Sequence, residues 1–379
     1  MKFVFAPDTF KGTLSSQEII TILTEKAQEH FTDVETVGVL IADGGEGTIE
    51  AVEQMKGGQR KYLEVTGPLG KKVNAYYLKL NDKQVLIEMA TASGITLIPY
   101  REGNALYTTS YGTGELIKDA LASGAEEIII SIGGSATNDG GIGMLSALGV
   151  KFFDIKENEL QPIGKNLINI ARIDISFLNE QVKKAKFTVM CDVINPLIGQ
   201  NGATYVFGPQ KGANKEHLEL LEKGMKHYAE KIKETLGRDV TKISGGGAAG
   251  GMGVALLAFC NASMQSGIKT ILNLINFNKI IADADLIITG EGRIDGQSAN
   301  GKVLDGIGNY ARERHIPVVA ITGGMGDNAH LVYDCGIDSI MVTVNKPMSL
   351  EMALDNAKSL LADCADRLFR FIKIGINLK

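Results

Sequence analysis

The chain has 379 residues, of which 44% are hydrophobic and 22% are charged, and this length predicts two or three domains with a large core. Its formal net charge of −5 at pH 7 provides no basic surface for nucleic acid or an anionic membrane. No apolar run approaches the roughly 18 residues that a membrane span needs, so we expect no membrane-spanning segment.

The N-terminal segment predicts two βα units in succession. Residues 1–7 predict a strand, and residues 15–31 predict an amphipathic helix that begins with a capping box of Ser15 and Glu18. Residues 34–55 predict a second strand, followed by a loop that opens a helix. This order predicts a parallel sheet with right-handed crossovers. Because the first apolar run is too short for a signal peptide, we expect a cytoplasmic protein.

The centre of the chain has a different pattern. Residues 62–90 alternate apolar and polar side chains around the turns "GPLG" and "LND", which predicts antiparallel or mixed strands. Two further strands are predicted at residues 125–134 and 185–193. Helices are predicted at residues 112–124, 139–149, 215–236 and 245–257. These elements predict a second α/β domain.

After Asp283 the βα pattern of the N-terminus returns. The C-terminal elements are predicted as strands at 284–290, 316–324 and 337–344 and as helices at 302–315 and 350–373. The fold class is therefore α/β, with a discontinuous Rossmann- or flavodoxin-like parallel-sheet domain and an inserted α/β domain of mixed sheet. We assign residues 1–62 plus 280–379 to the first domain and 63–279 to the second, with a ligand cleft between them.

Glycine is unusually frequent. The 45 glycines make up about 12% of the chain, against about 7% in an average protein. They cluster beside apolar runs, as in "ADGGEGT", "GGSATNDGGIG" and "TGEGRIDG". Glycines at strand ends let backbone N–H groups approach a bound anion closely.

Polar side chains gather in loops at the predicted strand ends. The loops contribute Asp8 and Lys11; Asp43 and Glu46; Ser135, Thr137, Asn138 and Asp139; Asp192, Asn195, Gln210 and Lys211; and Glu291, Arg293, Asp295, Ser298 and Lys302. Carboxylates, lysines and glycine-presented N–H groups are what phosphoryl transfer requires, because that reaction depends mainly on positioning and charge neutralisation. The alternative, structural role for an aspartate at a strand-to-helix junction is that of a helix cap.

Two glycine motifs and the positions of the histidines argue against a phosphate loop, a dinucleotide-binding site and a histidine-ligated metal site. Gly296, Gly301 and Lys302 fit most of the phosphate-loop pattern, but Val303 stands where that pattern needs a hydroxyl. "GGGAAG" fits G-x-G-x-x-G, but no acid stands about twenty residues on, which argues against a dinucleotide fingerprint. None of the five histidines lies in a metal-ligand pattern, so a bound metal should have oxygen ligands.

Six motifs together resemble those of the bacterial ATP-dependent glycerate kinase family. They are "APDTFKGTLSS", "ADGGEGT", "GGSATNDGGIGMLSALG", "CDVINPLIGQNGATYVFGPQKGA", "GGGAAGGMG" and "TGEGRIDGQSANGK". The resemblance runs from Lys2 to about Gly324. It implies a two-domain α/β enzyme that phosphorylates D-glycerate with ATP and Mg²⁺, with 2-phosphoglycerate favoured over 3-phosphoglycerate. It also implies that "GQSANGKV" is a loop of this family rather than a phosphate loop.

Within this reading, each candidate residue receives a role. Asp192 is the first choice for general base, because it follows an apolar strand and Asn195 lies three residues on; Asp8 and Asp295 come next. The other catalytic candidates are Lys11 and Lys302. The substrate- and phosphate-binding candidates are Gly133, Gly134, Ser135, Thr137, Asn138, Asn195, Gln210, Lys211, Arg293 and Ser298. The metal candidates are Asp43, Glu46, Asp139 and Glu291.

Two other functions stay open at this stage. A kinase of a related small hydroxy acid would need the same groups. A non-catalytic nucleotide or metabolite sensor would need the glycines and lysines but not so many carboxylates at strand ends. The expected partners are D-glycerate and ATP, without nucleic acid or membrane, and the sequence allows a homodimer.

Overall fold

The computed structural model describes residues 1–42, 44–45, 47–99, 103–299 and 302–378. The chain forms two compact units. Unit 1 comprises Met1–Asp43, Gln54–Lys56 and Ile268–Lys379, and unit 2 comprises Gly44–Glu53 and Gly57–Gly267. The units therefore change over at Gly44 and Ile268. The predicted domains, 1–62 plus 280–379 and 63–279, change over later at both places and stay a prediction.

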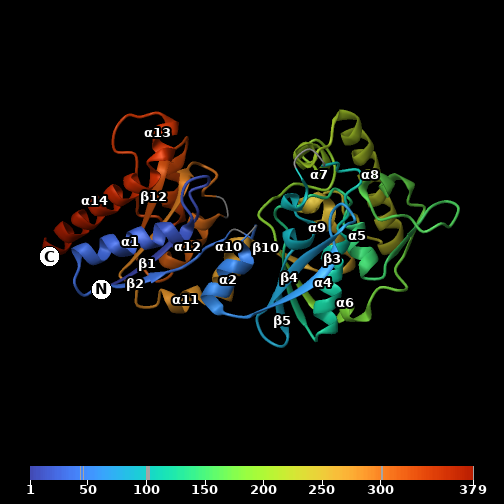
Figure 1. The fold of residues 1–379 in the computed structure, drawn as a ribbon, viewed down its shortest axis with the longest axis horizontal. Coiled ribbons are helices and arrows are strands. Elements are labelled where there is room, and N and C mark those ends of the chain that lie inside the picture. Colours follow the sequence, from blue (N-terminus) through green and yellow to red (C-terminus); the bar gives the residue numbers. More distant parts are fainter. Residues whose placement is uncertain (43, 46, 100–102, 300–301, 379) are drawn as a thin grey trace. The chain divides into compact units, whose positions relative to one another are not determined.

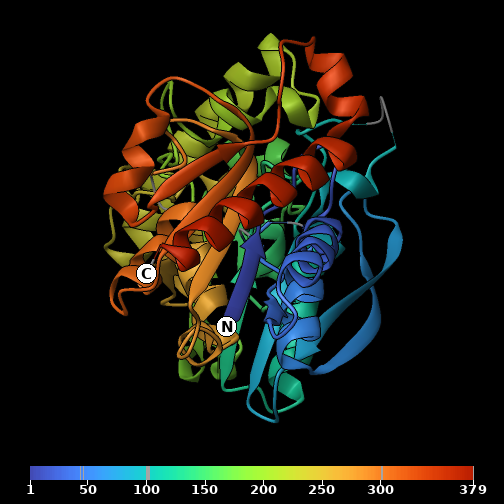
Figure 2. The ribbon, with the colours of Figure 1, turned by 90° about the vertical axis from the view of Figure 1, so that its left-hand side faces the viewer.

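Unit 1 is built on a five-stranded sheet in the order β13-β12-β11-β1-β2, with every neighbouring pair parallel. The strands are β1 (Lys2–Pro7), β2 (Glu35–Gly38), β11 (Leu286–Ile294), β12 (Val318–Met325) and β13 (Ser339–Val342). Counted along the chain, this is the 2-1-3-4-5 order of flavodoxin-like folds. The predicted parallel sheet, with its strands drawn from both ends of the chain, is confirmed (Figures 1 and 2).

Helices cover both faces of this sheet because the side chains of β1 alternate between two apolar clusters. Phe3 and Phe5 pack with α1 (Ser16–His30) and α14 (Ala357–Asn377), and the Phe3 ring stacks on Phe369 with centroids 5.9 Å apart. Val4 and Ala6 pack on the other face. The remaining helices of unit 1 are α10 (Gly267–Leu274, whose first residue belongs to unit 2), α11 (Phe277–Ile280), α12 (Val303–Arg312), η4 (Ala329–Cys335) and α13 (Leu350–Asp355).

The last predicted helix, residues 350–373, is broken in the structure. Helix α13 ends at Asp355 and α14 begins at Ala357, because Asn356 leaves the helical conformation at φ −104° and ψ 13°. The Asn356 side-chain amide donates a hydrogen bond to the Met352 carbonyl at 2.8 Å. Such local bonds let asparagine compete with the helical backbone pattern.

Unit 2 contains a six-stranded mixed sheet in the order β10-β9-β6-β5-β4-β3. Its strands are β3 (Gln59–Thr66), β4 (Lys72–Lys79), β5 (Gln84–Glu88), β6 (Glu127–Ser131), β9 (Lys186–Met190) and β10 (Ser263–Gln265). β3–β4 and β4–β5 are antiparallel, and β5, β6, β9 and β10 run parallel. The predicted mixed sheet is confirmed. The carboxyl ends of β6 and β9 are neighbours, since Ser131 pairs with Met190.

The helices of unit 2 surround a large apolar cluster. They are α2 (Thr48–Lys56, whose last residues belong to unit 1), α3 (Ala90–Ser93), η1 (Ile95–Leu97), α4 (Tyr111–Ala122), α5 (Ile142–Ala147), η2 (Gly164–Asn169), α6 (Glu180–Lys184), α7 (Ala203–Phe207), η3 (Pro209–Lys211), α8 (Lys215–Leu236) and α9 (Ala248–Phe259). In α9, Gly250 has φ +65°, and a Cβ atom there would lie 2.1 Å from the Thr137 carbonyl oxygen. "GGGAAG" therefore serves close backbone packing inside unit 2.

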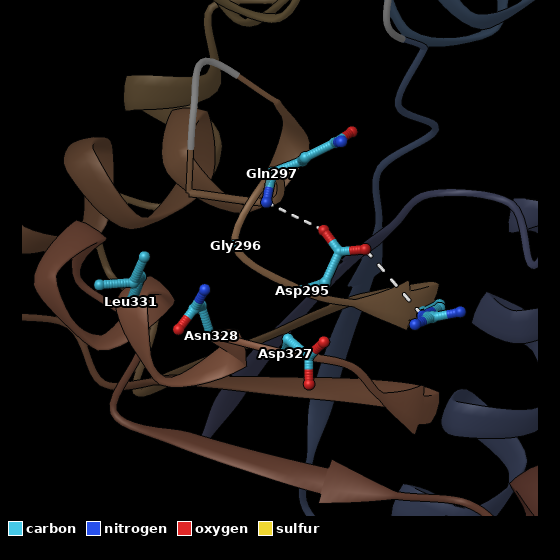
Figure 3. Close-up of a pocket in the computed structure, with 7 residues that line it drawn as sticks. Asp295, Gly296, Gln297, Asp327, Asn328 and Leu331 are labelled. Atoms are coloured by element: carbon cyan, nitrogen blue, oxygen red, sulfur yellow. Dashed lines mark hydrogen bonds and ion pairs between the residues drawn. The ribbon is translucent and has the colours of Figure 1, made fainter.

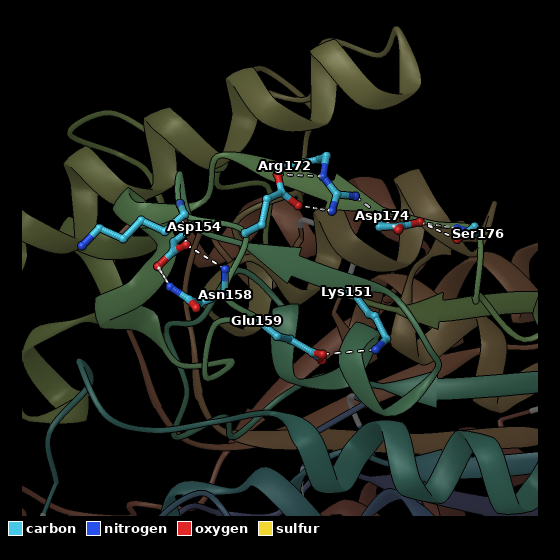
Figure 4. A network of polar contacts seen from close by, with 9 residues as sticks. Lys151, Asp154, Asn158, Glu159, Arg172, Asp174 and Ser176 are labelled. Atoms are coloured by element: carbon cyan, nitrogen blue, oxygen red, sulfur yellow. Dashed lines mark hydrogen bonds and ion pairs between the residues drawn. The ribbon is translucent and has the colours of Figure 1, made fainter.

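Unit 2 also contains a two-stranded antiparallel sheet of β7 (Lys151–Phe153) and β8 (Arg172–Asp174). Figure 4 shows its polar contacts: Lys151 pairs with Glu159 at 3.2 Å, and Arg172 pairs with Asp174 at 3.2 Å. Exposed pairs of this kind contribute little to the free energy of folding. Among the described residues, no helix combines the length and the apolar character that crossing a bilayer requires.

Candidate active site

Sheet A, the parallel sheet of unit 1, has its topological switch point between β1 and β11. From β1 the chain continues to β2 on one side, whereas β11 and the later strands lie on the other side. Ligands of open α/β sheets bind outside the carboxyl ends of the strands at such a point. Asp8 directly follows β1, and its backbone N–H donates to the Gly290 carbonyl at 2.8 Å. Glu291 and Arg293 lie in the carboxyl half of β11.

A cavity of about 790 Å³ opens at this edge of sheet A, a size typical of ligand sites. Its charged lining consists of Asp8, Lys11, Glu291, Arg293 and Lys302. Lys302 directly precedes α12, and Val303, the first residue of that helix, also lines the cavity, so the unpaired N–H groups of the first helical turn lie in the same region. Cations and a helix N-terminus together favour an anionic ligand.

Glu291 is an acidic residue of this cavity with a partly unsatisfied carboxylate. Its Oε1 atom is buried and has no hydrogen-bond partner among the described residues. Burial raises the pKa of the Glu291 carboxyl, against the opposing effects of a hydrogen bond from Ser298 and the charge of Lys302. No group of three acidic, histidine or cysteine side chains in the described structure could hold a metal by itself.

A second, polar cavity of about 380 Å³ shares Arg293 with the first. Asp295, Gln297, Asp327, Asn328 and Leu331 line it, as Figure 3 shows. One Asp295 carboxylate oxygen accepts from the Gln297 N–H at 2.9 Å, and the other lies 4.0 Å from the Arg293 guanidinium. The Arg293 side chain is 72% exposed, so its charge is available to a ligand in either cavity.

In unit 2, the predicted phosphate cradle follows β6. Gly134 is exposed, whereas Ser135, Thr137, Asn138 and Asp139 are buried. Asp139 accepts four hydrogen bonds, from the N–H and hydroxyl of Ser110 at 2.8 and 2.7 Å and from the N–H groups of Gly141 and Gly143 at 3.0 and 3.2 Å. Burial raises the pKa of Asp139, while these bonds oppose the rise. With its acceptor positions used in this way, Asp139 holds the turn in shape.

Lys211 lies directly beneath this turn, at the end of η3, and only 2% of its surface is exposed. Its ammonium donates to the Ser135 hydroxyl and to the Thr137 carbonyl, each at 2.6 Å. Burial lowers the pKa of Lys211 to about 7, against the opposing charge of Asp139. Lys211, which the sequence analysis lists as a candidate for substrate or phosphate binding, is thus an interior group whose ammonium contacts the glycine-rich turn. Its ligand-binding role stays a prediction.

Replacing Lys211 by methionine should remove a pH dependence of stability. An unfolded lysine titrates near 10.5 and the folded one near 7, so between these values the unfolded chain binds the extra proton. The free energy of unfolding of the parent should therefore rise with pH from about 7 to about 10.5, and that rise should be smaller in Lys211→Met. Urea unfolding at pH 7 and pH 9.5 measures it. Lys215→Met, at an exposed site, should keep the parent slope; equal slopes in all three proteins would contradict the prediction.

The remaining predicted residues of unit 2 follow β9 or lie in η3. Asp192 is exposed and accepts from the Gly267 N–H at 2.9 Å. The Asn195 side chain donates to the Asn201 carbonyl at 2.8 Å, and Gln210 is exposed. Because β6 and β9 are neighbours, Asp192 and the glycine-rich turn share one edge of the mixed sheet. Asp43 and Glu46 lie outside the described residues.

The structure brings together seven predicted residues in unit 1: Asp8, Lys11, Glu291, Arg293, Asp295, Ser298 and Lys302. It also reveals groups that the sequence analysis missed. Glu88 ends β5, is buried, and accepts from the Gly47 and Ile49 N–H groups at 3.1 and 3.2 Å, so it caps the start of α2. The one feature of the sequence that could have indicated Glu88 is its position as an acidic residue at the end of an apolar strand. The predicted cleft between the two domains stays a prediction.

Comparison with known proteins adds an independent finding. A model of the glycerate kinase family matches residues 3–373. The chain is 45% identical to Glycerate 2-kinase of Escherichia coli K12, over 100% of this chain and 99% of that one. It is 46% identical to glycerate kinase of Bacillus cereus, over 93% of both chains. A solved structure from Salmonella typhimurium LT2, provisionally assigned as glycerate kinase 2, superposes with a TM-score of 0.86 at 43% identity and covers 100% of this chain.

Proposed function

The chain belongs to the glycerate kinase family and is a kinase, and from this premise we propose that it transfers the γ-phosphoryl group of ATP to a hydroxyl of D-glycerate. The observation that carries the proposal is the cavity of about 790 Å³ at the switch point of sheet A. Three cationic side chains and a helix N-terminus face two carboxylates there, an arrangement suited to a triphosphate and its metal.

The residues present fit Mg²⁺. This ion prefers oxygen ligands and is commonly held by one or two carboxylates together with substrate phosphates. Asp8 and Glu291 would hold it, since both line the cavity and the buried Oε1 of Glu291 lacks a partner in the described structure. When bound, the ion neutralises charge on the phosphate oxygens. Lys11, Lys302 and the first N–H groups of α12 would hold those oxygens in place.

The acceptor would occupy the smaller cavity next to the phosphates. Arg293 lines both cavities and would bind the glycerate carboxylate. An arginine guanidinium can donate two parallel hydrogen bonds to one carboxylate. The oxygen of the glycerate hydroxyl then forms a bond to the γ-phosphorus, and the bond to the β-phosphate oxygen breaks and leaves ADP. The hydroxyl proton passes to the Asp295 carboxylate.

For the position of transfer, we propose the 2-hydroxyl, giving 2-phosphoglycerate. The support is the name of a relative, Glycerate 2-kinase, which is 45% identical over the whole chain. The phosphate-cradle role of the turn at Gly133–Asn138, the cytoplasmic location and the homodimer stay predictions.

A coupled assay with ATP, Mg²⁺ and D-glycerate tests the proposal. We expect ADP release that requires D-glycerate, and NMR of the product should place the phosphate on C2. L-glycerate, glycolate and tartronate are tested in the same assay. Faster ADP release with one of them than with D-glycerate would identify a kinase of a related hydroxy acid. Absence of ADP release with every acceptor would overturn the proposal and favour a sensor.

A further inference from the structure

Helix α13 has an unusual surface. None of its residues is buried, and it exposes three large apolar side chains: Leu350 at 75%, Met352 at 50% and Leu354 at 46%. Leu350 and Leu354 line the 790 Å³ cavity, whereas Met352 does not. An exposed apolar cluster inside a ligand cavity indicates that the ligand covers it.

Other apolar residues continue this surface at the same end of the cavity. Met325 closes β12 and is 50% exposed, and Val344 and Met348 lie on the segment between β13 and α13. We call Met325, Val344, Met348, Leu350 and Leu354 the apolar wall. It lies at the end of β12 and beyond the end of β13, while the cations lie near the ends of β1 and β11 and at the start of α12.

The cavity therefore has two chemically different ends. The outermost strand, β13, is two strand spacings from β11, roughly 10 Å. Gly323 and Gly324 line the cavity where β12 ends, and a Cβ atom on Gly324 would meet no atom within 4 Å. The absence of a side chain there keeps an open path between the two ends.

From this polarity we infer that the apolar wall holds the purine base of the nucleotide, while its phosphates lie at the cationic end. The inference rests on the proposed function and specifies the orientation of ATP in the same cavity. A purine offers two flat apolar faces, and it is the one part of ATP that an apolar surface can desolvate favourably. Glycerate has no apolar part of that size, so it would leave the wall exposed.

The test is Leu354→Asp, with Met352→Asp as the matched control on the same helix. Isothermal titration calorimetry with MgATP and with inorganic tripolyphosphate separates binding of the base from binding of the phosphates. We expect Leu354→Asp to weaken ATP binding by on the order of ten-fold or more and to leave tripolyphosphate binding unchanged. Met352→Asp should bind both ligands as the parent does. Because Leu354 is 46% exposed, the melting temperature of the variant should stay close to that of the parent.

Each outcome decides the inference. Unchanged ATP binding in Leu354→Asp would place the base elsewhere, and an equal loss for ATP and tripolyphosphate would show that Leu354 acts on the phosphates; either result overturns it. Failure of the proposed function looks different, because the parent protein would then release no ADP with D-glycerate. A parent that is active, combined with an unaffected Leu354→Asp, rejects the base position alone.

Discussion

Glu291→Gln should reduce kcat by about 100-fold or more, with the apparent Mg²⁺ requirement shifted to higher concentration. Glutamine keeps the size of the side chain but removes the charge that would hold the ion. Glu291 Oε1 is buried and unpartnered in the described structure, so the carboxylate is positioned for a ligand rather than for the fold. Initial rates measured against Mg²⁺ concentration at saturating ATP and D-glycerate give both quantities.

The same substitution should stabilise the protein at neutral pH. Burial raises the pKa of Glu291 above its usual 4.5, so the folded chain holds the proton to a higher pH than the unfolded chain does. The carboxylate therefore costs stability once the pH exceeds about 4.5, and Glu291→Gln should melt at a higher temperature at pH 7. This advantage should shrink as the pH falls toward 4.5.

The matched control is Glu313→Gln, which changes an exposed carboxylate near the end of α12. Its kcat, Mg²⁺ dependence and melting temperature should equal those of the parent. If Glu291→Gln also kept the parent kcat and Mg²⁺ dependence, Glu291 would lose its place as a metal ligand. A lower melting temperature would instead identify it as a structural group.

The sequence predicted helices and strands well where interactions between residues close together in the chain determine the structure. The capping box is an example: Ser15 accepts from the Glu18 N–H at 3.2 Å, and Glu18 accepts from the Ser15 N–H at 2.9 Å. The helix predicted at 139–149 is shorter in the structure, α5 starting at Ile142, because Gly140 and Gly141 adopt positive φ angles of 64° and 74°. Such angles follow from packing that the sequence does not display.

The part of the candidate site that lies at the carboxyl ends of strands could be predicted from the sequence. Asp8, Glu291 and Arg293 meet because the carboxyl ends of adjacent parallel strands share an edge, and the apolar runs before them revealed those strands. The apolar wall was not predicted, because the sequence indicates Leu350 and Leu354 only as parts of one long helix at residues 350–373. The burial of Lys211 was not predictable either, because its partners Ser135 and Thr137 lie more than 70 residues away in the chain. Contacts over such separations depend on the tertiary fold.

The general base can be identified by comparing two aspartates. The sequence favours Asp192, at the end of β9 in unit 2, whereas the proposal from unit 1 favours Asp295, beside Arg293 in the smaller cavity. We expect Asp295→Asn to lower kcat by about 100-fold or more, because asparagine cannot accept the hydroxyl proton, while the Kd for MgATP changes little. Asp192→Asn should keep kcat within a few-fold and serves as the comparison. Single-turnover rates with bound ATP exclude effects on product release, and a reversed order of the two effects would return the role of base to Asp192.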